Sequence, residues 1–140
     1  MNLKTIKLGI MHLNACIDLD KKSLKGLWSK SQWEIELTNP KRICIGVIDL
    51  ENNKLLGLCS SSLVLDELHI TFIAVHPTHQ RKGLGKLLMT NLIKLSKPLR
   101  TNHIYLEVKD KNEQAKFFYK SMGFKIEGKR TNFYKDGSDA

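Results

Sequence analysis

The sequence predicts an α+β domain with a mixed, mostly antiparallel β-sheet flanked by helices, and three observations carry this prediction. Strand-like and helix-like segments follow one another in the order β-α-α-β-β-β-α-β-α-β. The three central strand segments are joined by short polar turns, which favour an antiparallel meander. One strand–loop–helix–strand unit, Leu68 to Val108, is long enough to form a parallel pair with a right-handed crossover.

The chain begins with a predicted strand, Leu3 to Leu8, and a predicted helix, His12 to about Asp20. The helix is indicated by the helical spacing of Leu13, Cys16 and Ile17 on one face.

The start of a second helix is indicated by two local patterns. Ser29 and Gln32 have the spacing of a capping box, in which each side chain bonds a free amide at the helix start. Trp28 and Trp33 have the spacing of a hydrophobic staple. The proline shortly after Thr38 disfavours helical geometry before it, so the helix should end near Thr38.

Three strands form the predicted meander: Arg42 to Asp49, Lys54 to Leu65 and Leu68 to Val75. The first run is rich in β-branched residues, which favour strands. Polar residues between the runs, Glu51 to Lys54 and Asp66 to Glu67, predict the turns.

The second half of the chain alternates between helix and strand. A helix should begin near Gly83 and be stopped by Pro98, and His103 to Val108 predicts a strand. Asn112 is a favourable N-cap for a last helix, which Gly123 would close in a left-handed conformation.

Composition predicts one domain that covers residues 1–140, since 41% of the residues are hydrophobic and 26% are charged. Neither a signal peptide nor an apolar run of membrane-spanning length is visible, so a soluble, cytoplasmic protein without a membrane partner is expected. The three cysteines lie in apolar surroundings without a CxxC pair, which favours small buried side chains over disulfides, zinc ligands or nucleophiles. The oligomeric state stays open.

The net charge of +9 allows two interpretations: solubility, or an acidic partner such as a polyanionic cofactor. The basic residues are scattered and no arginine-rich run is interleaved with aromatic residues, so no direct nucleic-acid partner is expected. His76 and His79 flank Pro77, but they lack a third ligand, so they are interpreted as solvent-facing loop residues and no metal is expected.

The most informative segment is the loop Gln80 to Gly85, QRKGLG, between a buried strand and a helix. Its two glycines let the backbone approach a ligand closely. The exposed amides of a helix N-terminus favour a phosphate anion, and Arg81, Lys82 and Lys86 add positive charge. An ordinary basic loop would share the glycines and the charge. The strand, the chain-breaking proline, the basic loop and the helix together favour a phosphate site.

The QRKGLG segment resembles the Q/R-x-x-G-x-G/A acetyl-CoA loop of the GNAT acetyltransferase superfamily, and the resemblance extends over essentially the whole chain. It implies a GNAT fold with acetyl-CoA as cosubstrate. The strand backbone before the loop would bind the pantetheine arm, the loop amides would bind the pyrophosphate, and an asparagine would contact the cofactor's arm. Carried over, the arm is bound by Ile73, Ala74, Val75 and Asn112, and the pyrophosphate by Arg81, Lys82, Gly83, Leu84, Gly85 and Lys86.

Four further blocks resemble the RimI-like branch, the ribosomal-protein-alanine N-acetyltransferases. They are LWSKSQWEIELTNP, DELHITFIAVHP, YLEVKDKNEQAKFFYKSMGF and GKRTNFYKDGSDA. The departures from the branch's pattern are Leu68 for alanine, Lys109 for arginine, Phe118 for leucine and Phe133 for tyrosine, none of which removes a reactive group. The resemblance implies a peptide substrate, the N-terminal alanine of ribosomal protein S18.

Two residues are candidates for the acid–base chemistry. Glu107 would be the general base, directly or through water, and Tyr119 the general acid beside the cofactor sulfur. From the pattern alone, Glu107 fits a solvent-facing strand position and Tyr119 fits an inner helix face; the resemblance favours the catalytic roles. They imply direct transfer in a ternary complex.

Three alternatives stay open: a GNAT enzyme that acetylates lysine or a small amine, a non-catalytic acetyl-CoA-binding module, and a basic ribosome- or nucleic-acid-binding protein. Phe124 to Tyr134 predicts a last extended stretch, and Lys135 to Ser138 predicts a hairpin turn. The branch has a return strand after this turn, so the final C-terminal strand is expected to be missing from this sequence.

Overall fold

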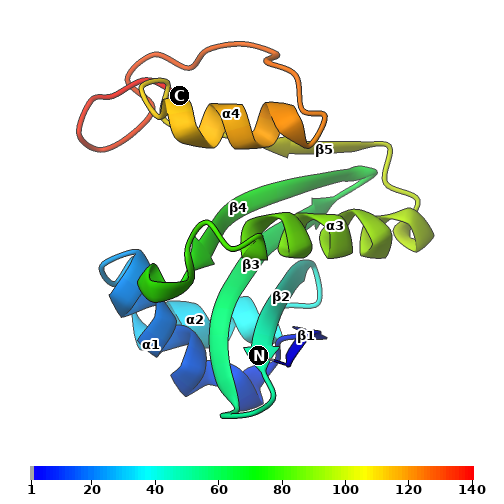
Figure 1. Cartoon of the computed structure of the whole chain (residues 1–140). Helices are drawn as coiled ribbons and strands as arrows, with labels where there is room; N and C mark the ends of the chain where they lie inside the picture. The colour runs from blue at the N-terminus through cyan, green and yellow to red at the C-terminus, as the bar shows by residue number, and fades with distance from the viewer. Residues whose placement is uncertain (1) are drawn as a thin grey trace. The chain divides into compact units, whose positions relative to one another are not determined.

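The computed structural model describes residues 2–140, which divide into two compact units, residues 2–105 and residues 106–140. Figure 1 shows the helices and strands of both units along the chain. The expectation of a single domain stays a prediction.

The sheet has the strand order β1-β2-β3-β4-β5. Its strands are β1 (Leu3–Lys7), β2 (Arg42–Asp49), β3 (Lys54–Val64), β4 (Glu67–Val75) and β5 (His103–Leu106). The first three neighbouring pairs are antiparallel, which confirms the predicted meander. The predicted bounds hold within about two residues, because short turns and chain breakers fix them locally.

The strand β5 is parallel to β4. The backbone amide of Asn102 donates to the carbonyl of Asp66 at 2.8 Å, and the Tyr105 ring lies 5.4 Å from that of His69. Residue numbers therefore increase in the same direction on both strands, as the predicted crossover requires.

The helices of the first unit are α1 (Leu13–Ser23), α2 (Lys30–Thr38) and α3 (Leu84–Ser96). The capping box of α2 is confirmed: Ser29 Oγ accepts from the Gln32 amide at 3.2 Å, and Gln32 Oε1 accepts from the Ser29 amide at 2.7 Å. The staple is confirmed as well, since the rings of Trp28 and Trp33 meet edge to face at 4.9 Å.

The helices lie on both faces of the sheet (Figure 1). Leu58 belongs to the buried cluster that includes Cys16 and Leu19 of α1, whereas a Cβ at the neighbouring Gly57 would lie 3.3 Å from Leu88 of α3. Consecutive strand residues point to opposite faces, so α1 and α3 cover opposite faces of β3.

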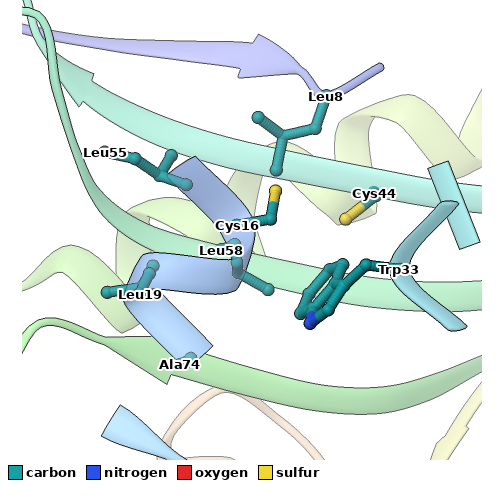
Figure 2. Packing of buried hydrophobic residues seen from close by; sticks show 8 residues of the cluster. All are labelled: Leu8, Cys16, Leu19, Trp33, Cys44, Leu55, Leu58 and Ala74. Carbon is teal, nitrogen blue, oxygen red and sulfur yellow. The ribbon is translucent and has the colours of Figure 1, made fainter. Parts of the chain in front are cut away.

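The core between α1, α2 and the sheet is apolar and closely packed, as Figure 2 shows. Its buried residues are Leu8, Cys16, Leu19, Trp33, Cys44, Leu55, Leu58 and Ala74. All three cysteines are buried and free, which confirms that they act as small apolar side chains.

We expect the folded protein to resist thiol reagents, because burial raises the pKa of Cys16 and Cys59 to about 12 and that of Cys44 further still. The thiolate is the reactive form, so the native thiols are protonated and shielded at mildly alkaline pH. Ellman's reagent should react with three thiols only after the protein is unfolded in guanidinium chloride. A thiol that reacts quickly in native buffer would contradict this packing.

The second unit contains α4 (Glu113–Ser121) and a C-terminal hairpin. Asn112 caps α4 as predicted, with Oδ1 accepting from the Ala115 amide at 3.0 Å, and Gly123 has the predicted left-handed φ of 98°. Two predictions were wrong. The strand predicted to reach Val108 ends at Leu106, so Glu107 follows β5 instead of lying within it.

The second wrong prediction is the extended stretch from Phe124 to Tyr134, which forms no regular strand. Instead, Arg130 and Ala140 exchange two backbone hydrogen bonds of 2.8 and 2.9 Å, and the Tyr134 carbonyl accepts from Gly137 at 2.9 Å. The predicted turn therefore forms and joins two short arms. Residues before Arg130 lack a facing segment in this hairpin, and a strand needs such a partner.

Candidate active site

The end of β4 is the first part of the candidate site. Cys59, Leu58 and Gly57 of β3 face Ile73, Ala74 and Val75 on one edge of β4. The other edge faces β5, a strand of four residues that starts beside the beginning of β4. So short a strand does not reach Val75, and backbone groups there stay available to a ligand.

A bulge precedes this end of β4. Ser60 pairs with Phe72 and Ser61 pairs with Ile70, so Thr71 is the extra residue of the strand. A bulge bends its strand and increases the local twist. The bulge therefore bends β4 just before the backbone that the resemblance assigns to the pantetheine arm, while β3 and β4 stay paired as far as Gly57 and Val75.

Side-chain hydrogen bonds fix the connection between β4 and α3. Gln80 Nε2 donates to the carbonyl of Val75 at 3.3 Å, and the Thr78 hydroxyl lies 2.9 Å from His76 Nδ1 and 2.8 Å from His79 Nδ1. The interpretation of His76 as solvent-facing was wrong, since only 8% of this residue is exposed. Burial, followed by the charges of Lys54 and Lys22, lowers the pKa of His76.

The phosphate loop leads into α3 through two left-handed residues, Arg81 with φ 61° and Gly83 with φ 82°. Gly83 is the N-cap and supplies no side-chain acceptor, and the first turn of α3 has no acidic residue. The amides of Leu84, Gly85 and Lys86 therefore keep their capacity to bind an anion, which the helix dipole favours.

The second unit holds the candidate acid–base residues. Glu107 is 41% exposed at its side chain, and its Oε1 lies 3.3 Å from Arg130 Nη2. Tyr119 is partly buried on α4, with its ring 5.2 Å from Phe118 and 5.7 Å from Phe124. Asn112 uses its side-chain oxygen for the helix cap, which leaves the amide nitrogen as the group that suits a ligand carbonyl.

Sequence reasoning missed Arg130 as a neighbour of Glu107. The residue comes into place because the C-terminal hairpin begins at Arg130. The only signal in the sequence was the turn at Lys135 to Ser138, which fixes where the chain reverses.

The sequence matches the acetyltransferase (GNAT) family across residues 10–124, which is most of the chain. The chain belongs to the GNAT acetyltransferase family. This family transfers acetyl groups from acetyl-CoA.

Similar proteins place the chain near one branch of the GNAT family. It is 39% identical over 61% of its length to a bS18-alanine N-acetyltransferase of Haemophilus influenzae, and the match spans 58% of that protein. A Bacillus subtilis relative, provisionally assigned the same activity, is 31% identical over 88% of this chain and 82% of its own length. The crystal structure of the Escherichia coli S18-alanine enzyme superposes with a TM-score of 0.88 at 27% identity, over 98% of this chain and 88% of that one.

Residues 2–140 contain neither a metal-binding cluster nor a membrane-spanning helix. No group of three or more His, Cys, Asp or Glu side chains in this part of the chain could hold a metal ion. None of the described helices is long and apolar enough to cross a membrane.

The hairpin that carries Arg130 should loosen in acid. Hydrogen bonds from the Ser138 hydroxyl and amide, with Lys109, hold the pKa of Asp136 well below its ordinary value, and the Asn132 amide lowers the pKa of Asp139. Because both folded pKa values are depressed, the stabilisation is complete above the unfolded value of 3.8 and is lost as the pH falls through the folded values.

We therefore expect amide hydrogen exchange in residues 130–140, corrected for intrinsic rates, to accelerate below about pH 4. The Asp136→Asn variant should exchange faster at neutral pH and depend less on pH. Equal protection of both proteins across this range would contradict the role of Asp136.

Proposed function

We propose that the protein acetylates the N-terminal alanine of a ribosomal protein of the bS18 type. The observation that carries this proposal is the likeness to the E. coli S18-alanine enzyme over 98% of this chain. The named relatives from H. influenzae and B. subtilis support the same substrate. Transfer is direct, from acetyl-CoA to the amine in a ternary complex.

The cofactor is bound by backbone groups of the first unit. The outer edge of Ile73, Ala74 and Val75 binds the pantetheine arm, because this part of β4 extends past β5. The uncapped first turn of α3 binds the pyrophosphate, with Arg81 and Lys82 adding charge. Lys86 lies at the third helical position and contributes its amide and its ammonium group.

The acetyl transfer needs an uncharged amine. An α-amino group has a pKa of about 7.7–8.0, so roughly a tenth is neutral at pH 7, against a far smaller fraction for lysine with a pKa of about 10.4. Glu107 takes the proton from the amine, directly or through one water, and the amine nitrogen then attacks the thioester carbonyl. The carbon–sulfur bond of the resulting tetrahedral intermediate then breaks, and Tyr119 donates a proton to the departing CoA sulfur. The nitrogen releases its second proton to solvent, which reprotonates the phenolate, and Glu107 returns its proton to solvent.

The Gly83→Ala variant should raise the KM for acetyl-CoA roughly 5- to 30-fold. A left-handed residue other than glycine costs about 1–2 kcal/mol, so alanine shifts the free loop away from the binding conformation. No neighbour lies within 4 Å of a Cβ at this position, so the effect comes from the backbone alone.

Gly137→Ala is the matched control, because Gly137 has a φ of 84° and the same open surroundings but lies outside the phosphate loop. It should leave the KM for acetyl-CoA unchanged. An equal rise in both variants would show that Gly83 has no particular part in cofactor binding.

A pair of peptides tests the substrate. One carries a free N-terminal alanine and no lysine, and the other has a blocked N-terminus and one internal lysine. CoA release only with the first peptide supports Nα-acetylation. CoA release only with the second peptide contradicts the proposed substrate but is still acetyltransferase activity. If neither peptide causes CoA release, small amines are the next substrates to test.

A further inference from the structure

The charges of the first unit are unevenly distributed along the chain. From Leu68 to Leu106 there is no aspartate or glutamate. The same segment contains six basic residues, Arg81, Lys82, Lys86, Lys94, Lys97 and Arg100. The rest of the chain holds 17 basic and 14 acidic residues, so this segment carries six of the nine net positive charges.

The structure brings the later cations onto one side of α3. Lys86, Thr90 and Lys94 are exposed and follow one another at helical i, i+4 spacing, and the exposed Lys97 and Arg100 continue past the helix end. We call Lys94, Lys97 and Arg100 the α3 basic ridge. Among the ion pairs of residues 2–140, none involves these three side chains, whereas Lys109, Lys116 and Lys129 all have carboxylate partners.

Cofactor binding does not account for the ridge. A rise of 1.5 Å per residue places Lys94 about 16 Å beyond Gly83, and Lys97 farther still, which is outside the reach of a pyrophosphate held at the helix start. The helix dipole favours cations near the last turn, which explains one lysine there. It does not explain Lys97 and Arg100, which follow the helix. Asp66, a nearby carboxylate in the turn before β4, accepts from Asn102 at 2.7 Å instead of pairing with a ridge cation.

We propose that the α3 basic ridge binds the phosphate backbone of RNA that accompanies the ribosomal-protein substrate. This inference rests on the proposed function, since a ribosomal protein is presented to the enzyme beside ribosomal RNA. A row of lysines and an arginine spaced along a helix suits successive phosphates, and it carries no aromatic residue to select a base. The ridge therefore increases capture of the RNA-bound substrate without sequence preference.

The ridge was not visible in the sequence as a motif, because its members are separated by apolar residues that face the sheet. Leu92 is buried just before the exposed Lys94, and Ser96 is buried between Lys94 and Lys97. Only the helical arrangement aligns the cations, and this is why the sequence alone favoured no nucleic-acid partner.

The test measures binding of a fluorescein-labelled single-stranded RNA by anisotropy over a series of salt concentrations, with CoA at saturation so that the phosphate loop is occupied. The triple variant Lys94→Gln, Lys97→Gln, Arg100→Gln is compared with a control of equal charge, Lys4→Gln, Lys7→Gln, Lys21→Gln. The control residues are exposed and have no ion pair among the described residues. Each lost phosphate contact should reduce the slope of log K against log salt by about 0.7, or roughly 2 in total.

A reduced slope and weaker RNA binding in the ridge variant alone, with acetylation of the free alanine peptide unchanged, support the inference. Equal effects in both triple variants, or no RNA binding by the unmodified protein, overturn it. If the ridge variant lost binding to polyglutamate more than binding to RNA, the ridge would be assigned to an acidic protein partner. That result would also overturn the inference. Failure of the proposed function is distinguished by the alanine peptide, which would then not be acetylated by any of the three proteins.

Discussion

Glu107→Gln should lower kcat for the alanine peptide about 10²- to 10⁴-fold, the usual contribution of a positioned general base. Glutamine keeps the size of the side chain and an oxygen for Arg130, whose Nη2 lies 3.3 Å from Glu107 Oε1. The fold and cofactor binding should therefore persist. Steady-state kinetics with peptide and acetyl-CoA measure the loss, and the two KM values should change little.

The loss of rate caused by Glu107→Gln should also depend on pH. The base is needed while the peptide amine is protonated, and the neutral fraction of the amine rises as the pH passes its pKa of about 7.7–8.0. The ratio of the unmodified to the variant rate should therefore fall above about pH 8. A ratio that stays constant with pH would assign Glu107 to positioning instead of proton transfer.

Glu113→Gln is the matched control for this substitution. Glu113 is also in the second unit, its side chain is 81% exposed, and it forms an i,i+3 ion pair with Lys116. Lys116 keeps its second partner, Asp110 at 3.3 Å, and an ion pair with one exposed partner contributes little, so kcat should be unchanged. If Glu107→Gln and Tyr119→Phe both matched this control, the chain would be a binding module instead of an enzyme.

The parts of the fold that sequence could predict are those with local causes. The capping box of Ser29 and Gln32, the cap at Asn112 and the left-handed Gly123 each depend on residues within a few positions of one another. The meander followed from short turns, and the phosphate loop from a strand, a proline and two glycines in sequence. Local steric and hydrogen-bonding rules suffice for all of these features.

The features that sequence missed depend on partners far along the chain. Glu36 is buried on α2, where it accepts from the Ser60 hydroxyl and lies 3.5 Å from Arg42 Nε. His76 is buried although it flanks a proline in a loop. The end of β5 at Leu106 and the hairpin from Arg130 depend on which segments pair, and no spacing rule fixes that pairing.

Asp20 is the second buried carboxylate with distant partners, and it fixes the connection between α1 and α2. The side chain accepts from the Leu27 amide at 2.7 Å, the Trp28 amide at 3.0 Å and Trp33 Nε1 at 2.8 Å. Asp20 is 1% exposed and Trp33 is fully buried. Water therefore has little access to Trp33 Nε1 if the carboxylate is removed, whereas the two backbone amides are only partly buried.

Asp20→Ala should reduce the free energy of unfolding by about 2–4 kcal/mol, because the buried Trp33 donor left unsatisfied costs about 1–3 kcal/mol and the two partly buried amides lose bonds to a charged acceptor. Urea unfolding followed by far-UV circular dichroism measures the loss. Asp18→Ala on the same helix is the control: its ion pair with Lys22 is exposed, so the change should stay below about 0.5 kcal/mol.

A double-mutant cycle with Trp33→Phe isolates one of the three bonds. If Nε1 donates to Asp20 as described, the two substitutions should be less than additive by about 1–2 kcal/mol, since either one alone breaks the same bond. The Asp20→Ala substitution should also disturb β4 at the candidate site. The ring of Trp28, whose amide Asp20 binds, lies 4.9 Å from the ring of Phe72, the residue before Ile73. Additive effects would mean that Asp20 stabilises the α1–α2 connection only through the two backbone amides.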